Sequence, residues 1–107
     1  IIMFEVLKYL FSSDRKSNLG SLIKNDAFLV DVRSPEEFAS AHAKGSFNIP
    51  IEKLKNQLHR FKNKKNIIVF CKSGLRSSKA KSILEKNGIS HVTNGGSWEN
   101  IEKLLKP

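Results

Sequence analysis

The sequence predicts one α/β domain built around a mostly parallel β-sheet, and three observations support this fold class. Short apolar runs rich in β-branched residues alternate with segments whose apolar residues recur at helical spacing. The run Ile67–Phe70 is apolar throughout, as expected of a strand that is buried on both faces of a parallel sheet. The chain of 107 residues can bury one hydrophobic core but not two, so residues 1–107 are assigned to a single domain.

Residues 1–25 are predicted to form a helical extension that packs on the core. Residues 2–11 are strongly apolar at a helical spacing, which favours a short helix over a membrane anchor. Ser17 and Asn18 are suitable N-terminal caps for a second helix. Asn25–Asp26 then has the composition of a turn into the first strand.

A strand and a capped helix are predicted next. Phe28–Val32 is an apolar run with one charged residue, which favours a buried strand. Ser34 can cap the following helix, with Pro35 at its first position and Glu37 able to complete a capping box. We expect this helix to be short and to end before Gly45.

A brief strand and a longer helix precede the central strand. Phe47–Ile49 is predicted to be the strand, and Pro50 then opens the helix. The inner side of this helix is expected to carry four apolar residues, Ile51, Leu54, Leu58 and Phe61. Residues 63–66 form a polar turn into the central strand.

The chain after the central strand is predicted to contain a helix, one more strand and a last helix. Gly88 is placed as the stop of the first of these helices, and His91–Thr93 as a short strand. Asn94–Gly96 has the composition of a turn and is expected to lead into the last helix. The apolar residues of the last helix are Trp98, Ile101, Leu104 and Leu105.

Cys71, the only cysteine of the chain, directly follows the central strand and is the candidate nucleophile. Open α/β sheets bind ligands at the carboxyl ends of their strands. The small loop Lys72–Arg76 contains Gly74 and precedes a helix, so its backbone N–H groups can surround an anion. These amides, the helix N-terminus and Arg76 are expected to stabilise a thiolate and lower the pKa of Cys71. The alternative, an inert buried cysteine, fits this position less well.

Several motifs carry a family resemblance, in addition to the spacing of four residues between Cys71 and Arg76. The motifs upstream of Cys71 are Leu29–Arg33, Pro35–Phe38 and His42–Pro50. In this order and at these distances, the set resembles a single-domain rhodanese, which is a sulfurtransferase. The resemblance extends from about Phe28 to Trp98 and implies a three-layer α/β/α fold with about five short strands.

The resemblance implies transfer of sulfane sulfur in two steps. The Cys71 thiolate attacks the outer sulfur of a small anionic donor such as thiosulfate and becomes a persulfide. A thiol or cyanide acceptor, which includes the thiol of a partner protein, then removes the sulfur. Both the thiolate and the persulfide are anionic, so the same backbone amides serve both states. No metal and no organic cofactor is expected.

The active-site loop is assigned to six residues: Lys72, Ser73, Gly74, Leu75, Arg76 and Ser77. Arg76 has a planar guanidinium that can bind the oxyanion of the donor or brace the carbonyls of the loop. Pairing of Arg76 with a nearby carboxylate is compatible with the second role. Ser73 and Ser77 can donate to a persulfide or cap the helix, and Lys72 can attract an anion. Gly74 is expected to supply a backbone shape closed to other residues.

Asp31 and Arg33 lie at the end of a neighbouring predicted strand. The resemblance places them in the structural frame around the active-site loop rather than in the reaction. His42 is a candidate general base, but a thiol that is already ionised does not need one, so His42 is interpreted as structural. Two features depart from the family pattern: Trp98 follows the glycine pair after one residue instead of a few, and the first ten residues have no counterpart.

Three alternative functions follow from the same residues. A phosphatase or an arsenate reductase also pairs a cysteine with an arginine, but it needs a loop one residue longer than the one between Cys71 and Arg76. A non-catalytic interaction module of this fold often lacks the cysteine. A sulfur-relay protein, which receives persulfide sulfur from a partner enzyme, differs from a free-standing enzyme only in its donor.

The composition limits the partners and the compartment. The formal net charge is +9, but the lysines are spread along the chain with few aromatic residues between them. We therefore expect a solvated basic surface that attracts small anions, and no nucleic-acid partner. No apolar run is long enough to cross a membrane. A monomer is expected, in either the cytoplasm or the periplasm.

Overall fold

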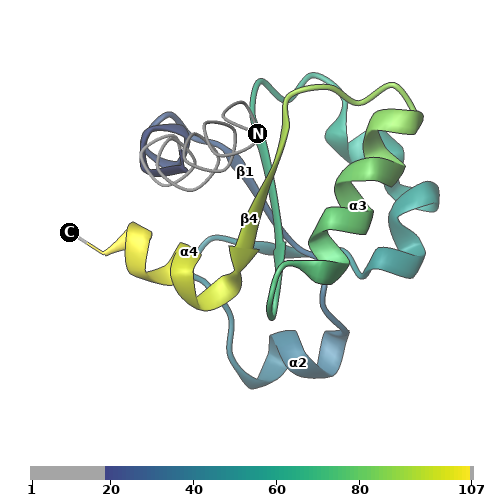
Figure 1. Ribbon diagram of the computed structural model, residues 1–107. Coiled ribbons are helices and arrows are strands. Elements are labelled where there is room, and N and C mark those ends of the chain that lie inside the picture. Colours follow the sequence, from purple (N-terminus) through teal and green to yellow (C-terminus); the bar gives the residue numbers. More distant parts are fainter. Residues whose placement is uncertain (1–18, 107) are drawn as a thin grey trace, which may run out of the picture.

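Four strands form the centre of the domain, in the order β2-β1-β3-β4 (Figure 1). They are β1 (Phe28–Asp31), β2 (Phe47–Asn48), β3 (Ile67–Cys71) and β4 (Val92–Ser97). All three strand pairings are parallel, so the carboxyl ends of the strands meet at one edge of the sheet. This computed structural model describes residues 19–106. Within that range the sheet has four strands, where about five were expected.

Helices cover both faces of the sheet, which confirms the three-layer architecture. The 3-10 helix η1 (Ile51–Phe61) and α3 (Leu75–Lys86) pack on one face. The helical residues 19–24 and α4 (Trp98–Leu105) pack on the other. Helix α2 (Pro35–Ser40) lies beyond the carboxyl ends of the strands, at the bottom of Figure 1. The part of the chain that the structure describes contains no helix long and apolar enough to cross a membrane.

The alternation of side chains along β3 divides the core into two halves. Ile67 and Val69 are fully buried against η1 and α3, whereas Ile68 and Phe70 are fully buried on the face covered by α4. Successive side chains of a strand point to opposite faces, so a strand covered on both sides must be apolar at every position. Cys71 ends the strand on the side of α3.

The structure confirms the predicted start of α2. The Ser34 hydroxyl accepts a hydrogen bond from the Glu37 backbone N–H at 3.2 Å, and the Glu37 carboxylate accepts one from the Ser34 backbone N–H at 3.2 Å. These two bonds form the capping box, and Pro35 occupies the first helical turn. The segment after Pro50 differs from the expected helix, because it is a 3-10 helix with a non-helical residue at Gln57.

Two other elements also differ from the expectations. The strand predicted at residues 91–93 instead begins at Val92 and runs to Ser97, so Asn94–Gly96 is not a turn. The predicted helix over residues 2–11 and the caps at Ser17 and Asn18 lie outside the described residues.

Packing explains the glycines of β4. A β-carbon added at Gly95 would lie 2.7 Å from the Ile68 side chain and 2.9 Å from that of Ile101. Opposite Val69 and Cys71, β4 also contains one residue more than β3, and Gly96 there has a φ of +80°. Glycine inside a strand marks such a bulge or a close approach as well as a turn, and composition alone does not separate these cases.

Candidate active site

Cys71 lies at the carboxyl end of β3, and only 1% of it is exposed. The backbone N–H of Gly74 donates a hydrogen bond to the Cys71 Sγ at 3.0 Å. The residues between them, Lys72 and Ser73, are exposed. Gly74 has a φ of +100°, a left-handed conformation that glycine adopts without steric cost, and it precedes the first turn of α3. The loop therefore turns a backbone donor onto the sulfur, as predicted.

The surroundings of Cys71 favour its thiolate. Burial raises the pKa of the thiol, but hydrogen bonds from Ser77 and from the backbone N–H groups of Gly74 and Ser73 outweigh it, so the pKa is lowered. Burial is the largest single cause, but the hydrogen bonds to the charged form together exceed it. A thiol with a lowered pKa is more ionised, and therefore more often nucleophilic, at neutral pH.

Arg76 is paired with Glu37 of α2. The two guanidinium nitrogens of Arg76 donate to the two carboxylate oxygens of Glu37 at 2.6 and 2.9 Å. The hydrogen bond from Arg76 is the largest cause that lowers the pKa of Glu37 to about 2. Of the roles considered for Arg76, this geometry matches pairing with a carboxylate. The ion pair ties the start of α3, next to the active-site loop, to the capped end of α2.

The Glu37–Arg76 pair predicts a pH-dependent contribution to stability. Because the pKa of Glu37 is about 2 in the folded state against an ordinary 4.5, the contribution is complete above about pH 4.5 and is lost as the pH falls toward 2. About a third of each side chain is exposed, so we expect Glu37→Gln to lower the free energy of unfolding by only about 0.5–1 kcal/mol at pH 7. Urea unfolding between pH 2 and 7 measures this.

The matched control is Glu36→Gln, which removes the same charge at the exposed neighbouring position. It should retain the loss of stability between pH 4.5 and 2 that the Glu37→Gln variant lacks. If the Glu37→Gln variant loses stability over that range as the unsubstituted protein does, the pair does not contribute as proposed.

Asp31 and Arg33 form a buried ion pair at the end of β1. The Arg33 side chain donates to both carboxylate oxygens of Asp31 at 2.7–2.9 Å, and it also donates to the Ala41 carbonyl at 2.7 Å. The side chains of Asp31 and Arg33 are 0% and 5% exposed. No hydrogen bond joins this pair to Cys71 within residues 19–106. The location of the pair therefore fits the expected role in the structural frame around the loop.

Trp98 and His42 occupy positions beside this frame. Trp98 is the first residue of α4, and the Arg33 guanidinium lies 4.8 Å from the centre of its ring. The His42 ring stacks on Phe38 at 3.9 Å between ring centres and shares a hydrogen bond with the Phe38 carbonyl at 2.8 Å. These contacts fit the structural interpretation of His42.

Sequence reasoning missed Asn94. Its side chain lies in β4 and reaches the active-site loop, where it binds Gly74 and Ser77. Asparagine followed by two glycines has the composition of a turn, and this local pattern concealed the contact. Only the pairing of β4 with β3 brings Asn94 opposite Val69, two residues before Cys71.

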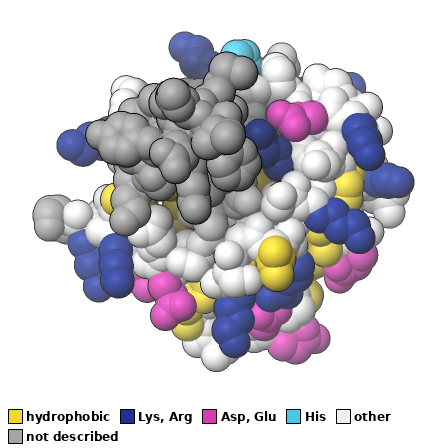
Figure 2. All heavy atoms as spheres, in the orientation of Figure 1, with side chains coloured by type: hydrophobic (Ala, Val, Ile, Leu, Met, Phe, Trp, Pro, Cys, Tyr) yellow, Lys and Arg dark blue, Asp and Glu magenta, His cyan; other side chains and the backbone are white. Residues whose placement is uncertain are grey.

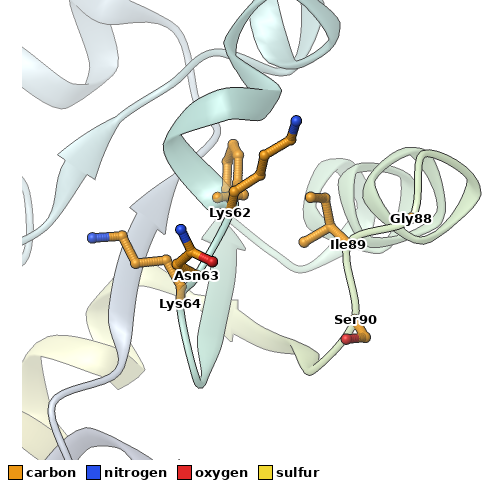
Figure 3. A pocket seen from close by; sticks show the side chains of 7 residues that line it. Lys62, Asn63, Lys64, Gly88, Ile89 and Ser90 are labelled. Carbon is orange, nitrogen blue, oxygen red and sulfur yellow. The ribbon is translucent and has the colours of Figure 1, made fainter.

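Two cavities within residues 19–106 are lined by residues other than Cys71. Figure 3 shows a cavity of about 280 Å³ between Lys62–Lys64 and Gly88–Ser90, which precede β3 and β4 and so lie at the edge of the sheet opposite Cys71. A second cavity of about 240 Å³ lies beside the carboxyl end of β2 and is lined by Asn48, Lys53 and Arg60 among others. Lys and Arg side chains are spread over the face in Figure 2 rather than gathered in one patch.

Comparison with known proteins identifies the family. A family model described as a rhodanese-like domain matches residues 16–103. The chain is 36% identical over 74 residues to thiosulfate sulfurtransferase PspE of Escherichia coli, covering 67% of this chain and 71% of that protein. It is 30% identical to a putative mitochondrial thiosulfate sulfurtransferase of Schizosaccharomyces pombe, over 91% of this chain and 80% of that one.

The solved structures agree with this result. A human single-domain sulfurtransferase superposes with a TM-score of 0.67 at 28% identity, covering 85% of this chain and 93% of that one. The resemblance inferred from the motifs is therefore confirmed at the level of the fold and the family. This chain belongs to the rhodanese-like domain family of sulfurtransferases.

Proposed function

We propose that this protein transfers sulfane sulfur through a persulfide on Cys71. The observation that carries the proposal is the hydrogen bond from the Gly74 N–H to the Cys71 Sγ at 3.0 Å, at the end of a buried strand and with a lowered thiol pKa. A backbone donor aimed at the sulfur stabilises the negative charge of both the thiolate and the persulfide. The names of the relatives support the same class of reaction.

The two steps balance without a cofactor. With thiosulfate as donor, the Cys71 thiolate attacks the outer sulfur, the bond between the two sulfur atoms of thiosulfate breaks, and sulfite leaves with the electron pair. The acceptor, either cyanide or a thiolate, then attacks the terminal sulfur of the persulfide. The new bond gives thiocyanate or a new persulfide, and the Cys71 thiolate is regenerated.

The side chains of the active-site loop are assigned two roles: some stabilise the conformation of the loop, and others attract the sulfur donor. Arg76 is committed to Glu37, so we assign it to bracing the loop rather than to binding the donor. Lys72 is exposed next to Cys71 and is assigned to attracting an anionic donor. The same commitment of Arg76 disfavours phosphatase chemistry, in which the arginine must face the oxyanion.

A sulfur relay from a protein persulfide is the second candidate, and it rests on Leu75. This residue begins α3 beside the active-site loop and is 81% exposed. A large apolar side chain next to the nucleophile can be buried by a partner protein that delivers or accepts sulfur. The relay uses the same Cys71 persulfide, so only the donor distinguishes it from a free-standing thiosulfate sulfurtransferase.

The test is the intact mass of the reduced protein after incubation with thiosulfate. We expect a gain of one sulfur atom per chain, which is lost when cyanide or a small thiol is added. A second sample receives glutathione persulfide, which represents the donors of a relay. Sulfur gained from the persulfide alone selects the relay. No sulfur from either donor, with Cys71 still freely alkylated, would count against the proposal, and a phosphatase substrate would then be tested.

A further inference from the structure

The Asn94 carboxamide links β4 to both sides of the active-site loop. Its Oδ1 accepts hydrogen bonds from the Ser77 hydroxyl at 2.7 Å and from the Gly96 backbone N–H at 3.0 Å. Its Nδ2 donates to the Gly74 carbonyl at 3.1 Å. Gly74 donates to the Cys71 sulfur, and the Ser77 hydroxyl lies 3.5 Å from it. Asn94 therefore does not touch the sulfur itself but bonds two residues, Gly74 and Ser77, that do.

Two backbone groups determine which way the amide of Asn94 faces. The Gly96 N–H can only donate and the Gly74 carbonyl can only accept. A flipped amide would place a donor against a donor and an acceptor against an acceptor. The oxygen of Asn94 must therefore face Ser77, so the hydroxyl proton of Ser77 is directed at Asn94.

This orientation of the Asn94 amide determines which hydrogen-bonding groups of Ser77 and Gly74 face the Cys71 sulfur. Ser77 has a single hydroxyl proton, and two acceptors, Asn94 Oδ1 and Cys71 Sγ, lie within its reach. With the neutral thiol, that proton points at Asn94 and the Ser77 oxygen can accept from the S–H; when the thiol ionises, the same proton can turn to the sulfur, so Asn94 and the thiolate compete for it. The Gly74 N–H is held on the sulfur because the carbonyl of the same residue is anchored by Asn94.

We propose that Asn94 is a positioning residue for Cys71, which sets the ionisation of the thiol by orienting Gly74 and Ser77. The inference rests on the proposed role of Cys71 as the nucleophile and adds a residue outside the active-site loop. The charged groups around the loop are Lys72, Arg76 with its partner Glu37, and the Asp31–Arg33 pair. None of these is changed by a substitution of Asn94.

The test is Asn94→Asp, which keeps the shape of the side chain and its two acceptor contacts. The carboxylate has no N–H for the Gly74 carbonyl and adds a negative charge near the sulfur, and both changes disfavour the thiolate. We expect the midpoint of the pH profile of Cys71 alkylation by iodoacetamide to rise by about one pH unit, and alkylation at pH 7 to slow by up to about tenfold. Neither readout depends on sulfur transfer, so failure of the proposed function would be seen separately.

The matched control is Asn100→Asp, the same change in the first turn of α4, where the Asn100 backbone N–H donates to the Ser97 hydroxyl and the Asn100 side chain has no hydrogen bond to any residue of 19–106. The control should leave the alkylation profile unchanged. An unchanged profile in the Asn94→Asp variant, or an equal shift in the control, overturns the proposal. A purely structural role would lower the melting temperature without moving the profile.

A measurement on the unsubstituted protein covers the case in which the Asn94→Asp variant does not fold. In an NMR titration, we expect the side-chain amide signals of Asn94 and the backbone amide of Gly74 to shift with the same midpoint as the Cβ of Cys71. The side-chain amide of Asn100 should not follow that midpoint. Asn94 signals that stay constant through the titration of Cys71 would contradict the proposed coupling.

Discussion

Replacing Cys71 with serine is expected to abolish sulfur transfer, with a loss of activity on the order of a thousandfold or more, as is typical when a nucleophile is removed. A serine hydroxyl is not ionised at neutral pH, and its oxygen cannot form the persulfide on which the cycle depends. The amides that surround the sulfur cannot compensate, because they stabilise a charge that the hydroxyl does not carry. The measurements are the rate of thiocyanate formation from thiosulfate and cyanide, and the intact mass after loading.

The control for this prediction is Ser82→Ala, on the exposed side of α3 away from the active-site loop. It should load sulfur as the unsubstituted protein does. Because Cys71 is almost fully buried, circular dichroism of the Cys71→Ser variant is needed to test that its fold is retained. Residual loading above a small fraction of the normal rate would mean that Cys71 is not the carrier.

Replacing Asp31 with alanine is expected to give the largest loss of stability. Arg33 is buried with this carboxylate as its main partner, and removal of Asp31 leaves a buried guanidinium bonded only to the Ala41 carbonyl among the described residues. Breaking one side of a buried ion pair costs about 3–5 kcal/mol, a large share of the total stability of a small domain. Urea unfolding measures this loss, and the melting temperature should fall by roughly 15 °C.

Two controls separate the buried charge from a general loss of contacts. The double variant Asp31→Ala/Arg33→Met removes the unpaired charge and should recover part of the stability lost in the single variant. Glu85→Ala breaks the exposed Lys81–Glu85 pair and should cost less than about 0.5 kcal/mol. A double variant that is less stable than Asp31→Ala by the full cost of Arg33→Met alone would show that the two residues are not coupled.

The position of the candidate nucleophile followed from local sequence patterns. An apolar run ending in the single cysteine, then a short loop with Gly74, predicted a strand, a candidate nucleophile and a helix start, and the structure contains the strand and the helix with Cys71 between them. The capping box of Ser34 and Glu37 was equally local, since its partners lie within one helical turn. Interactions between residues close in the chain are decided by the order of residue types alone.

The interactions that hold the active-site loop were not visible in this way. Glu37 and Arg76 are 39 residues apart, and each had a sufficient local interpretation of its own, one as a helix cap and the other as part of the loop. Asn94 was assigned to a turn because asparagine and glycine are common to turns and to strand bulges. The actual conformation depends on how β4 packs against Ile68 and Ile101, side chains distant in the sequence.

The sequence by itself therefore determined the fold class and the family of this protein, and it placed the candidate nucleophile at the end of the central strand. Buried strands and capped helices depend on the spacing of apolar and polar residues, which can be read along the chain. The tertiary structure decided which groups surround the sulfur: Arg76 turned toward Glu37, and Asn94 toward Gly74 and Ser77. These contacts depend on strand order and register, which join residues that no local pattern connects.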